Sequence, residues 1–242
     1  MRESMGVPRG RRAKTGLVVG WLALVPVAAA GQAAPEASQG AAAAEGRVID
    51  RVVAVIGNQV LTLSELEFET RVALVQRGGV RAAEARLDEQ TLRGALELAI
   101  NQRLLVAGAD RLQAFAAERS EVEARLKVFR ERFEDETALL AFLARHDADL
   151  EQLFAVLERG VRAERILDSR CRLRAQVSEA ETRRYWEEHK AALGGPYESV
   201  REALKEKLIR ERYSQLAKEE FAQVRAGAKV RRVAPFAREA LP

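Results

Sequence analysis

The chain has 242 residues, of which 48% are apolar and 31% are charged, and it carries 40 basic and 36 acidic side chains. Residues 1–30 hold five basic groups and one acidic group, which accounts for the whole net charge of +4. The remainder is formally neutral, so the alkaline pI of 9.4 gives no support for nucleic-acid binding. The chain has a single cysteine, Cys171, so it cannot form an internal disulfide. We expect Cys171 to be an ordinary partly buried residue.

Residues 1–30 have the order of an export signal. A basic segment is followed by a short apolar run that Pro26 interrupts, and Ala28-Ala29-Ala30 then supplies small residues for a signal peptidase. The apolar run is shorter than the ~20 residues that a membrane-spanning helix needs. We therefore predict a cleaved signal peptide and a periplasmic protein; the alternative is an uncleaved membrane anchor. Residues 31–46, rich in Ala, Gly, Pro and Ser, are predicted to be a flexible linker.

The folded part is expected to begin with a small β-hairpin. Residues 48–56 are rich in β-branched side chains, Gly57-Asn58 can turn the chain, and residues 60–62 form a return strand. Thr62 and Glu65 have the spacing of a capping box for a helix that runs to about Arg77 and ends at Gly78-Gly79.

Helical periodicity dominates the rest of the chain. Asp88 is a plausible cap for a central buried helix, and Ser120 with Glu123 is predicted to cap the next helix. Shorter helices are expected over 139–145 and from near Asp149. Ser178 with Glu181 is predicted to cap a helix that carries Tyr185, Trp186 and Leu193. A last long helix should span about 198–225 and stop at Gly227, and the segment KVRRVAPF could add a closing strand.

These patterns predict a mainly α fold: an irregular helical unit with a small N-terminal β-hairpin and a long C-terminal helix. Catalytic chemistry is not indicated. His146 and His189 lie far apart, neither has a His or Cys neighbour at metal-ligand spacing, and phosphate-binding and nucleophile-elbow motifs are absent from the sequence. We expect no catalytic residue, no metal site and no cofactor. His189 shares the stripe of Tyr185 and Trp186, which favours a packed or interfacial histidine over a general base.

The sparse aromatic residues support two interpretations. At helical spacing they are typical of ordinary core packing. Alternatively, some of them line an apolar surface that binds extended polypeptide segments. The candidate residues for such client binding are Phe129, Phe133, Phe142, Leu143, Phe154, Tyr185 and Trp186.

The segment VIDRVVAVIGNQVLTLSELE (48–67) resembles the opening of the SurA family of periplasmic chaperones, where a strand pair enters a helix through a Thr-x-Ser motif. LELAINQRLLVAGADRL (96–112) is similar to the second helix of that family. VSEAETRRYWEEHKAAL (177–193) is similar to the segment that leads into the parvulin isomerase domain of SurA chaperones. The sequence from Pro196 to Val230 is similar to the helix and strand that follow this isomerase domain. The resemblance covers residues 47–233 and leaves residues 234–242 as a tail.

The resemblance implies that the two ends of this unit pack together, and that a parvulin domain would be inserted at residues 194–196. Here Gly194-Gly195-Pro196 closes that position, and no strand of the parvulin active-site type is present. We therefore expect a non-enzymatic, ATP-independent chaperone module that binds unfolded or outer-membrane polypeptides through apolar helical surfaces. We expect it to bind no nucleic acid and not to be inserted in the membrane after signal removal. A homodimer is a possible oligomeric state. The alternatives are a helical scaffold or interaction subunit of an envelope complex, and a divergent peptidyl-prolyl isomerase.

Overall fold

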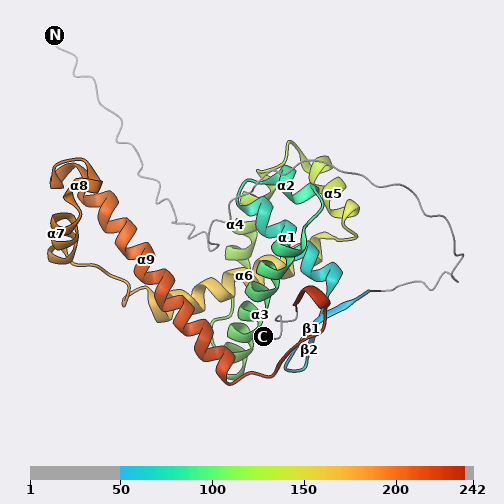
Figure 1. Cartoon of the computed structure of the whole chain (residues 1–242). Helices are drawn as coiled ribbons and strands as arrows, with labels where there is room; N and C mark the ends of the chain where they lie inside the picture. Colours follow the sequence, from blue (N-terminus) through green and yellow to red (C-terminus); the bar gives the residue numbers. More distant parts are fainter. Residues whose placement is uncertain (1–49, 238–242) are drawn as a thin grey trace, which may run out of the picture. The chain divides into compact units, whose positions relative to one another are not determined.

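The computed structural model describes residues 50–237 (Figure 1). The predicted signal peptide and linker lie outside these residues. A β-hairpin, β1 (Val52–Ile56) and β2 (Gln59–Thr62), leads into α1 (Leu63–Gln76), and the mainly α fold is as predicted. The elements that follow are α2 (Val80–Glu84), α3 (Glu89–Arg111), α4 (Arg119–Arg130), α5 (Glu136–Arg145), α6 (Leu150–Cys171), α7 (Glu179–Glu188), α8 (Lys190–Leu193), α9 (Tyr197–Ala226), β3 (Val230–Arg232) and a 3₁₀ turn (Pro235–Ala237).

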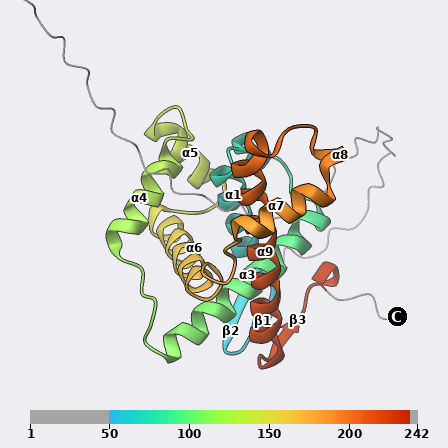
Figure 2. The same ribbon diagram turned by 90° about the vertical axis from the view of Figure 1, so that its left-hand side faces the viewer.

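The three strands join the two ends of the described chain. The sheet has the order β2-β1-β3, and β3 pairs antiparallel with β1, with Ala54 opposite Arg232 (Figure 2). This confirms the predicted closing strand. The buried side of the sheet packs with one face of α3 in the first apolar core, to which Ala234 and Ala237 also belong. Residues 234–237, expected in a tail, thus contribute to the core instead.

Local hydrogen bonds explain where the first helix begins. The N–H of Thr62 donates to Glu65 Oε2 at 3.0 Å, and the N–H of Glu65 donates to Thr62 Oγ1 at 3.4 Å, which confirms the predicted capping box. Asp50 adds a second tie, since Ser64 Oγ donates to its Oδ2 at 2.5 Å. The start of β1 is thereby fixed to the start of α1.

A second apolar core lies between α1, α2, α4, α5 and α6. α2, which the sequence did not predict, is held there by buried Ala83 and by Arg71 of α1. The Arg71 guanidinium donates to the carbonyl oxygens of Ala83 and, at 2.9 Å, of Ala85. Such a five-residue helix has too short a pattern to recognise, and it depends on a partner 12 residues earlier in the chain.

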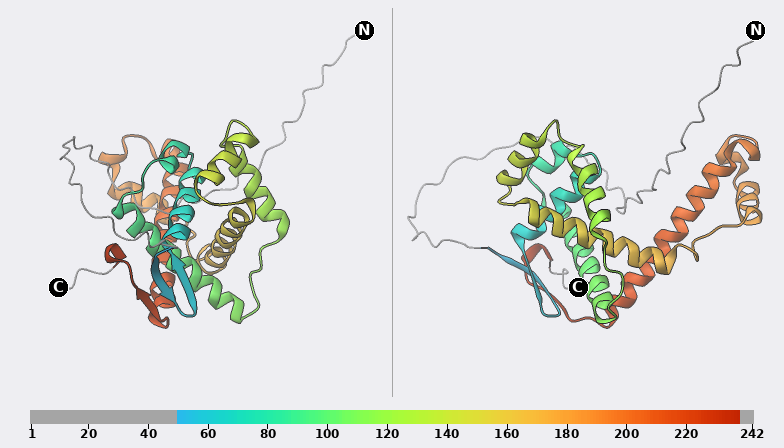
Figure 3. Two further views of the ribbon diagram at one scale, coloured as in Figure 1. Left: turned by 90° about the vertical axis from the view of Figure 1, so that its right-hand side faces the viewer. Right: turned by 180° about the vertical axis from the view of Figure 1, so that it is seen from behind.

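The long helix α9 packs on opposite sides along its length. Near its N-terminal end Leu204 is buried, and α7 is the neighbour; near its C-terminal end Tyr213 and Ala217 are buried, with α6 and α3 as neighbours (Figure 3). Leu204 and Tyr213 are nine residues apart. At about 100° per residue this places them on opposite sides of the helix. We call residues 178–212 the arm, and residues 50–177 with 213–237 the body.

Two predicted helix boundaries are wrong. α4 begins at Arg119 rather than after Ser120, and its first turn is capped by Glu121, whose Oε2 accepts the N–H of Glu118 at 3.0 Å. The carboxylate of Glu123 instead pairs with Arg119 at 2.8 Å, so it is not available to cap. The helix predicted to carry Tyr185, Trp186 and Leu193 is also broken, because His189 leaves the helical conformation and separates α7 from α8.

Candidate functional site

The predicted client-binding residues fall into two groups. Five of them lie in the body, in or against the second apolar core: Phe129 on α4, Phe133 just after it, Phe142 and Leu143 on α5, and Phe154 on α6. Three rings form a cluster in which Phe133 lies 5.6 Å from Phe129 and 5.3 Å from Phe142 between centroids. Tyr185 and Trp186 lie in the arm.

Burial separates the body residues into core and surface. Phe129, Phe142 and Leu143 are at most 2% exposed, so in this structure they pack the core and meet no solvent. Phe133 and Phe154 are partly buried at the margin of that core. On the same helices Val128 and Leu140 are about half exposed. Sequence reasoning missed these two because they lie off the apolar stripe that marked the core.

The arm is held together by aromatic and charged contacts. The Tyr185 ring stacks on His189 with centroids 4.0 Å apart, and Tyr185 Oη accepts a hydrogen bond from Lys207 Nζ at 3.3 Å. His189 Nδ1 lies 2.8 Å from the carbonyl oxygen of Tyr185. His189 thus lies exposed at the end of α7, where its ring contacts Tyr185.

Trp186 fixes the joint at residues 194–196. Its indole Nε1 donates to the carbonyl oxygen of Gly195 at 3.1 Å, and its ring meets Tyr197 edge to face. Gly194 has φ = 61°, a left-handed conformation that favours glycine, and it ends α8. Pro196 precedes the first turn of α9. The joint is therefore a compact turn that is hydrogen-bonded to Trp186 of α7.

A pocket of about 320 Å³ opens between α7 and α9. Its apolar wall comes from Val177, Tyr185 and Leu208. The polar wall comes from Glu181, Arg184, Glu188, Glu211 and Arg212. Of the seven predicted residues, only Tyr185 lines this pocket. Sequence reasoning missed Leu208 as a site residue, although it lies within the predicted last helix.

The charges of the pocket are partly neutralised. Glu181 Oε1 accepts a hydrogen bond from Arg212 at 2.7 Å. The backbone N–H of Ser178, the Arg212 guanidinium and the Ser178 hydroxyl lower the pKa of Glu181 to about 2. Within the described part of the chain, the side chains of Arg184 and Glu188 have no hydrogen-bond or ion-pair partner. The opening thus offers one cation and one anion beside an apolar wall.

The two histidines lie in different parts of the molecule, His146 in the body and His189 in the arm. His146 ends α5 in the body, where its ring meets Phe142 edge to face and its Nε2 atom is buried without a hydrogen-bond partner. Burial, together with the charges of Arg71 and Arg145, lowers the pKa of His146. Among residues 50–237 there is no group of three or more His, Cys, Asp or Glu side chains placed to hold a metal ion.

Over the same residues, no helix combines the length and the apolar character that crossing a membrane requires. Comparison with models of known protein families gives no match for this chain. Comparison with curated proteins gives no significant match either.

Proposed function

We propose that the protein is an ATP-independent periplasmic chaperone module that binds unfolded or outer-membrane polypeptides through surfaces of its arm and body. The resemblance of residues 48–67 to the opening of SurA chaperones supports this function. The pairing of β3 with β1 is consistent with it, because the resemblance implies that the ends of the unit pack together.

The observation that carries the proposal is the pocket between α7 and α9. Its apolar wall, with a cation and an anion free to form bonds, suits side chains of varied chemistry rather than one sequence. Its volume is at the low end of the range of small-molecule pockets. We infer that it takes one or two side chains of an extended client segment, which gives weak and broad binding.

Weak binding matches the task of holding an outer-membrane strand protein. Such chains expose alternating apolar residues in water and are prone to aggregate before they reach the membrane. Many weak contacts retard aggregation, and release follows when the client folds, without nucleotide hydrolysis.

The test is the aggregation of a urea-unfolded outer-membrane protein on dilution, with and without an equimolar amount of this protein and no ATP. We expect suppression by the natural chain, a marked loss of suppression with Tyr185→Ala, and retention with Tyr185→Phe, which keeps the ring but loses the hydroxyl that contacts Lys207. Light scattering that is unchanged by the natural chain over a range of ratios would overturn the proposal.

A scaffold subunit of an envelope complex is the second candidate, favoured by the closed packing of Phe129, Phe142 and Leu143. A protein whose core is closed can bind one fixed partner through its outer surface. Affinity capture from an envelope extract separates the two functions, since a scaffold retains one partner in fixed stoichiometry and a chaperone retains many non-native chains. A divergent prolyl isomerase would accelerate a proline-limited refolding reaction, which takes tens of seconds without catalysis.

A further inference from the structure

The second half of α9 lies outside both apolar cores, and charged groups contribute to its attachment to the body. The two apolar cores are built from the hairpin, the helices α1 to α6 and the C-terminal 3₁₀ turn, and no α9 residue belongs to either. From residue 213 onward the buried apolar side chains of α9 are those of Tyr213 and Ala217. Leu216, Phe221 and Val224 are partly buried as well, so the segment covers apolar side chains that belong to neither core.

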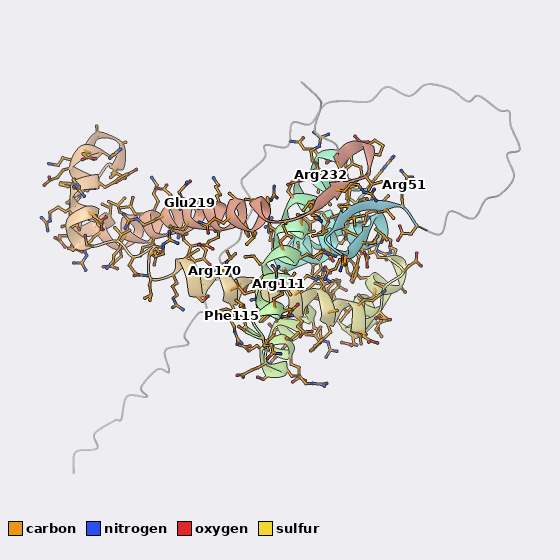
Figure 4. All side chains as sticks on the ribbon, turned by 90° about the horizontal axis from the view of Figure 1, so that it is seen from below. Arg51, Arg111, Phe115, Arg170, Glu219 and Arg232 are labelled. Carbon is orange, nitrogen blue, oxygen red and sulfur yellow. The ribbon has the colours of Figure 1, made fainter. Side chains whose placement is uncertain are left out.

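Charged groups make the attachment to α6. Glu220 of α9 is 7% exposed and accepts hydrogen bonds from Arg170 at 3.1 Å and Arg174 at 3.4 Å. The neighbouring Glu219 lies 3.9 Å from Arg174. Figure 4 shows Arg170 and Glu219 where the end of α6 runs beside α9. The hydroxyl of Tyr213 donates to Asp168 Oδ1 at 2.7 Å.

Charged groups also make the attachment to α3. The Arg225 guanidinium donates to Asn101 Oδ1 at 2.6 Å and lies 2.7 Å from Glu97 Oε2. Arg232, which follows in β3, pairs with the same Glu97 at 2.9 Å. Burial acts to raise the pKa of Glu97, but the hydrogen bonds and charges of the two arginines outweigh it and lower that pKa. Beyond α9 the chain is anchored in the first core by Ala234 and Ala237.

Cys171 lies on the side of α6 that α9 covers. It is one turn beyond Asp168, the partner of Tyr213, and it is 0% exposed. Burial raises the pKa of the Cys171 thiol, and the nearby carboxylate of Glu220 acts in the same direction. The only thiol of the chain thus lies beneath the attached segment and reports whether that segment is in place.

We propose that residues 213–226 form a strap that detaches from α6 and α3 while both apolar cores stay folded, and that each detachment uncovers Cys171. Ion pairs that separate into water regain their hydration, which offsets much of their attraction, and detachment leaves the apolar side chains of both cores buried. Opening of the strap should therefore cost much less free energy than global unfolding, which must expose both cores. This inference goes beyond the proposed function and does not depend on it.

The experiment follows the reaction of Cys171 with N-ethylmaleimide, an uncharged thiol reagent, under native conditions by mass spectrometry. We expect labelling in the natural protein that is faster than global unfolding allows and almost independent of low urea concentrations. Glu220→Gln removes the charge that Arg170 and Arg174 contact, and it should accelerate labelling about tenfold, because the two arginines are left without the buried anion that offsets their charge.

Two control variants distinguish opening of the strap from a general effect of removing a surface charge and from global unfolding. Glu206→Gln removes a carboxylate of an exposed pair with Arg210 on the same helix and should leave the labelling rate unchanged. Val122→Ala weakens the second core, to which no residue of α9 belongs, and should lower global stability without accelerating labelling.

The proposal is overturned if Val122→Ala accelerates labelling as much as Glu220→Gln does, or if labelling has the full urea dependence of unfolding. Either result means that the thiol is reached only when the whole protein unfolds. Should Glu220→Gln lack the helical circular dichroism of the natural chain, Arg170→Gln replaces it, because Arg170 is less exposed than Arg174 and makes the shorter contact with Glu220, at 3.1 Å. An unchanged rate in Arg170→Gln would then contradict the proposal.

Discussion

The carboxylate of Glu69 on α1 joins three helices through charge. Its two oxygens accept hydrogen bonds from Arg103 of α3 at 2.9 and 2.6 Å, and one of them also contacts Arg159 of α6. The side chains of Glu69 and Arg103 are only 11% and 8% exposed. Burial acts to raise the pKa of Glu69, but the two guanidinium groups outweigh this effect and lower it.

Replacement of Glu69 by Gln keeps the shape and removes the charge. Because both guanidinium groups contact the same oxygen, their nitrogens lie within roughly 5 Å of each other, and at an effective dielectric constant of about 20 their repulsion is about 3 kcal/mol. Arg159 is 24% exposed and can turn toward water, which relieves part of this repulsion. With the weakened hydrogen bonds included, we expect Glu69→Gln to lower the free energy of unfolding by about 3 kcal/mol.

Urea unfolding followed by circular dichroism measures this change at neutral pH. The double variant Glu69→Gln with Arg159→Gln should lose about 1–2 kcal/mol less than the sum of the two single losses, because it removes the repulsion. Glu123→Gln is the matched control, since its pair with Arg119 is 56% and 85% exposed and should change stability by under about 0.5 kcal/mol. A loss below about 1 kcal/mol for Glu69→Gln, or strictly additive losses, would refute the reasoning.

Three further predictions use the same unfolding measurement. Burial acts to raise the pKa of Asp50, but hydrogen bonds from Ser64, Thr62 and the backbone outweigh it and lower the pKa to about 2 from 3.8. Because Asp50 is exposed, Asp50→Asn should lower the free energy of unfolding by only about 1 kcal/mol at neutral pH. This difference in stability from the natural protein should vanish as pH falls from about 4 through 2, because the carboxylate becomes protonated. A difference in stability that does not change with pH contradicts this prediction. Gly194→Ala, at φ = 61°, should cost about 1 kcal/mol, and an unchanged stability would show that the joint adjusts freely. Phe129→Ala should lower the free energy of unfolding by about 3–5 kcal/mol because it leaves a cavity in the second core. A decrease under about 1 kcal/mol would mean that the surrounding side chains move in and fill this cavity.

Local signals in the sequence predicted most of the elements. The hairpin and the caps at Thr62, Asp88 and Ser178 depend on residues within a few positions of each other, and the structure confirms all of them. α4 is the exception, because two overlapping capping-box spacings occur near its start, Glu118 with Glu121 and Ser120 with Glu123, and the structure uses the first.

The candidate site could be predicted only in part. Tyr185 was named from its position on a helical stripe, and it lines the pocket. Phe129 and Phe142 have the same kind of spacing, yet they are buried against each other, with ring centroids 6.5 Å apart. Spacing gives the side of a helix on which a residue lies, but it cannot give the helix that packs against that side.

By itself the sequence determined that this protein is mainly helical, that a hairpin precedes the first helix, and that a compact joint separates two helices near its end. Those features depend on backbone propensity and on hydrogen bonds between near neighbours. Only the tertiary structure decided that α9 packs on opposite sides along its length, that Glu69 receives two arginines, and that Cys171 lies beneath α9. Each of these depends on partners from distant parts of the chain, and no local pattern specifies which distant surfaces meet.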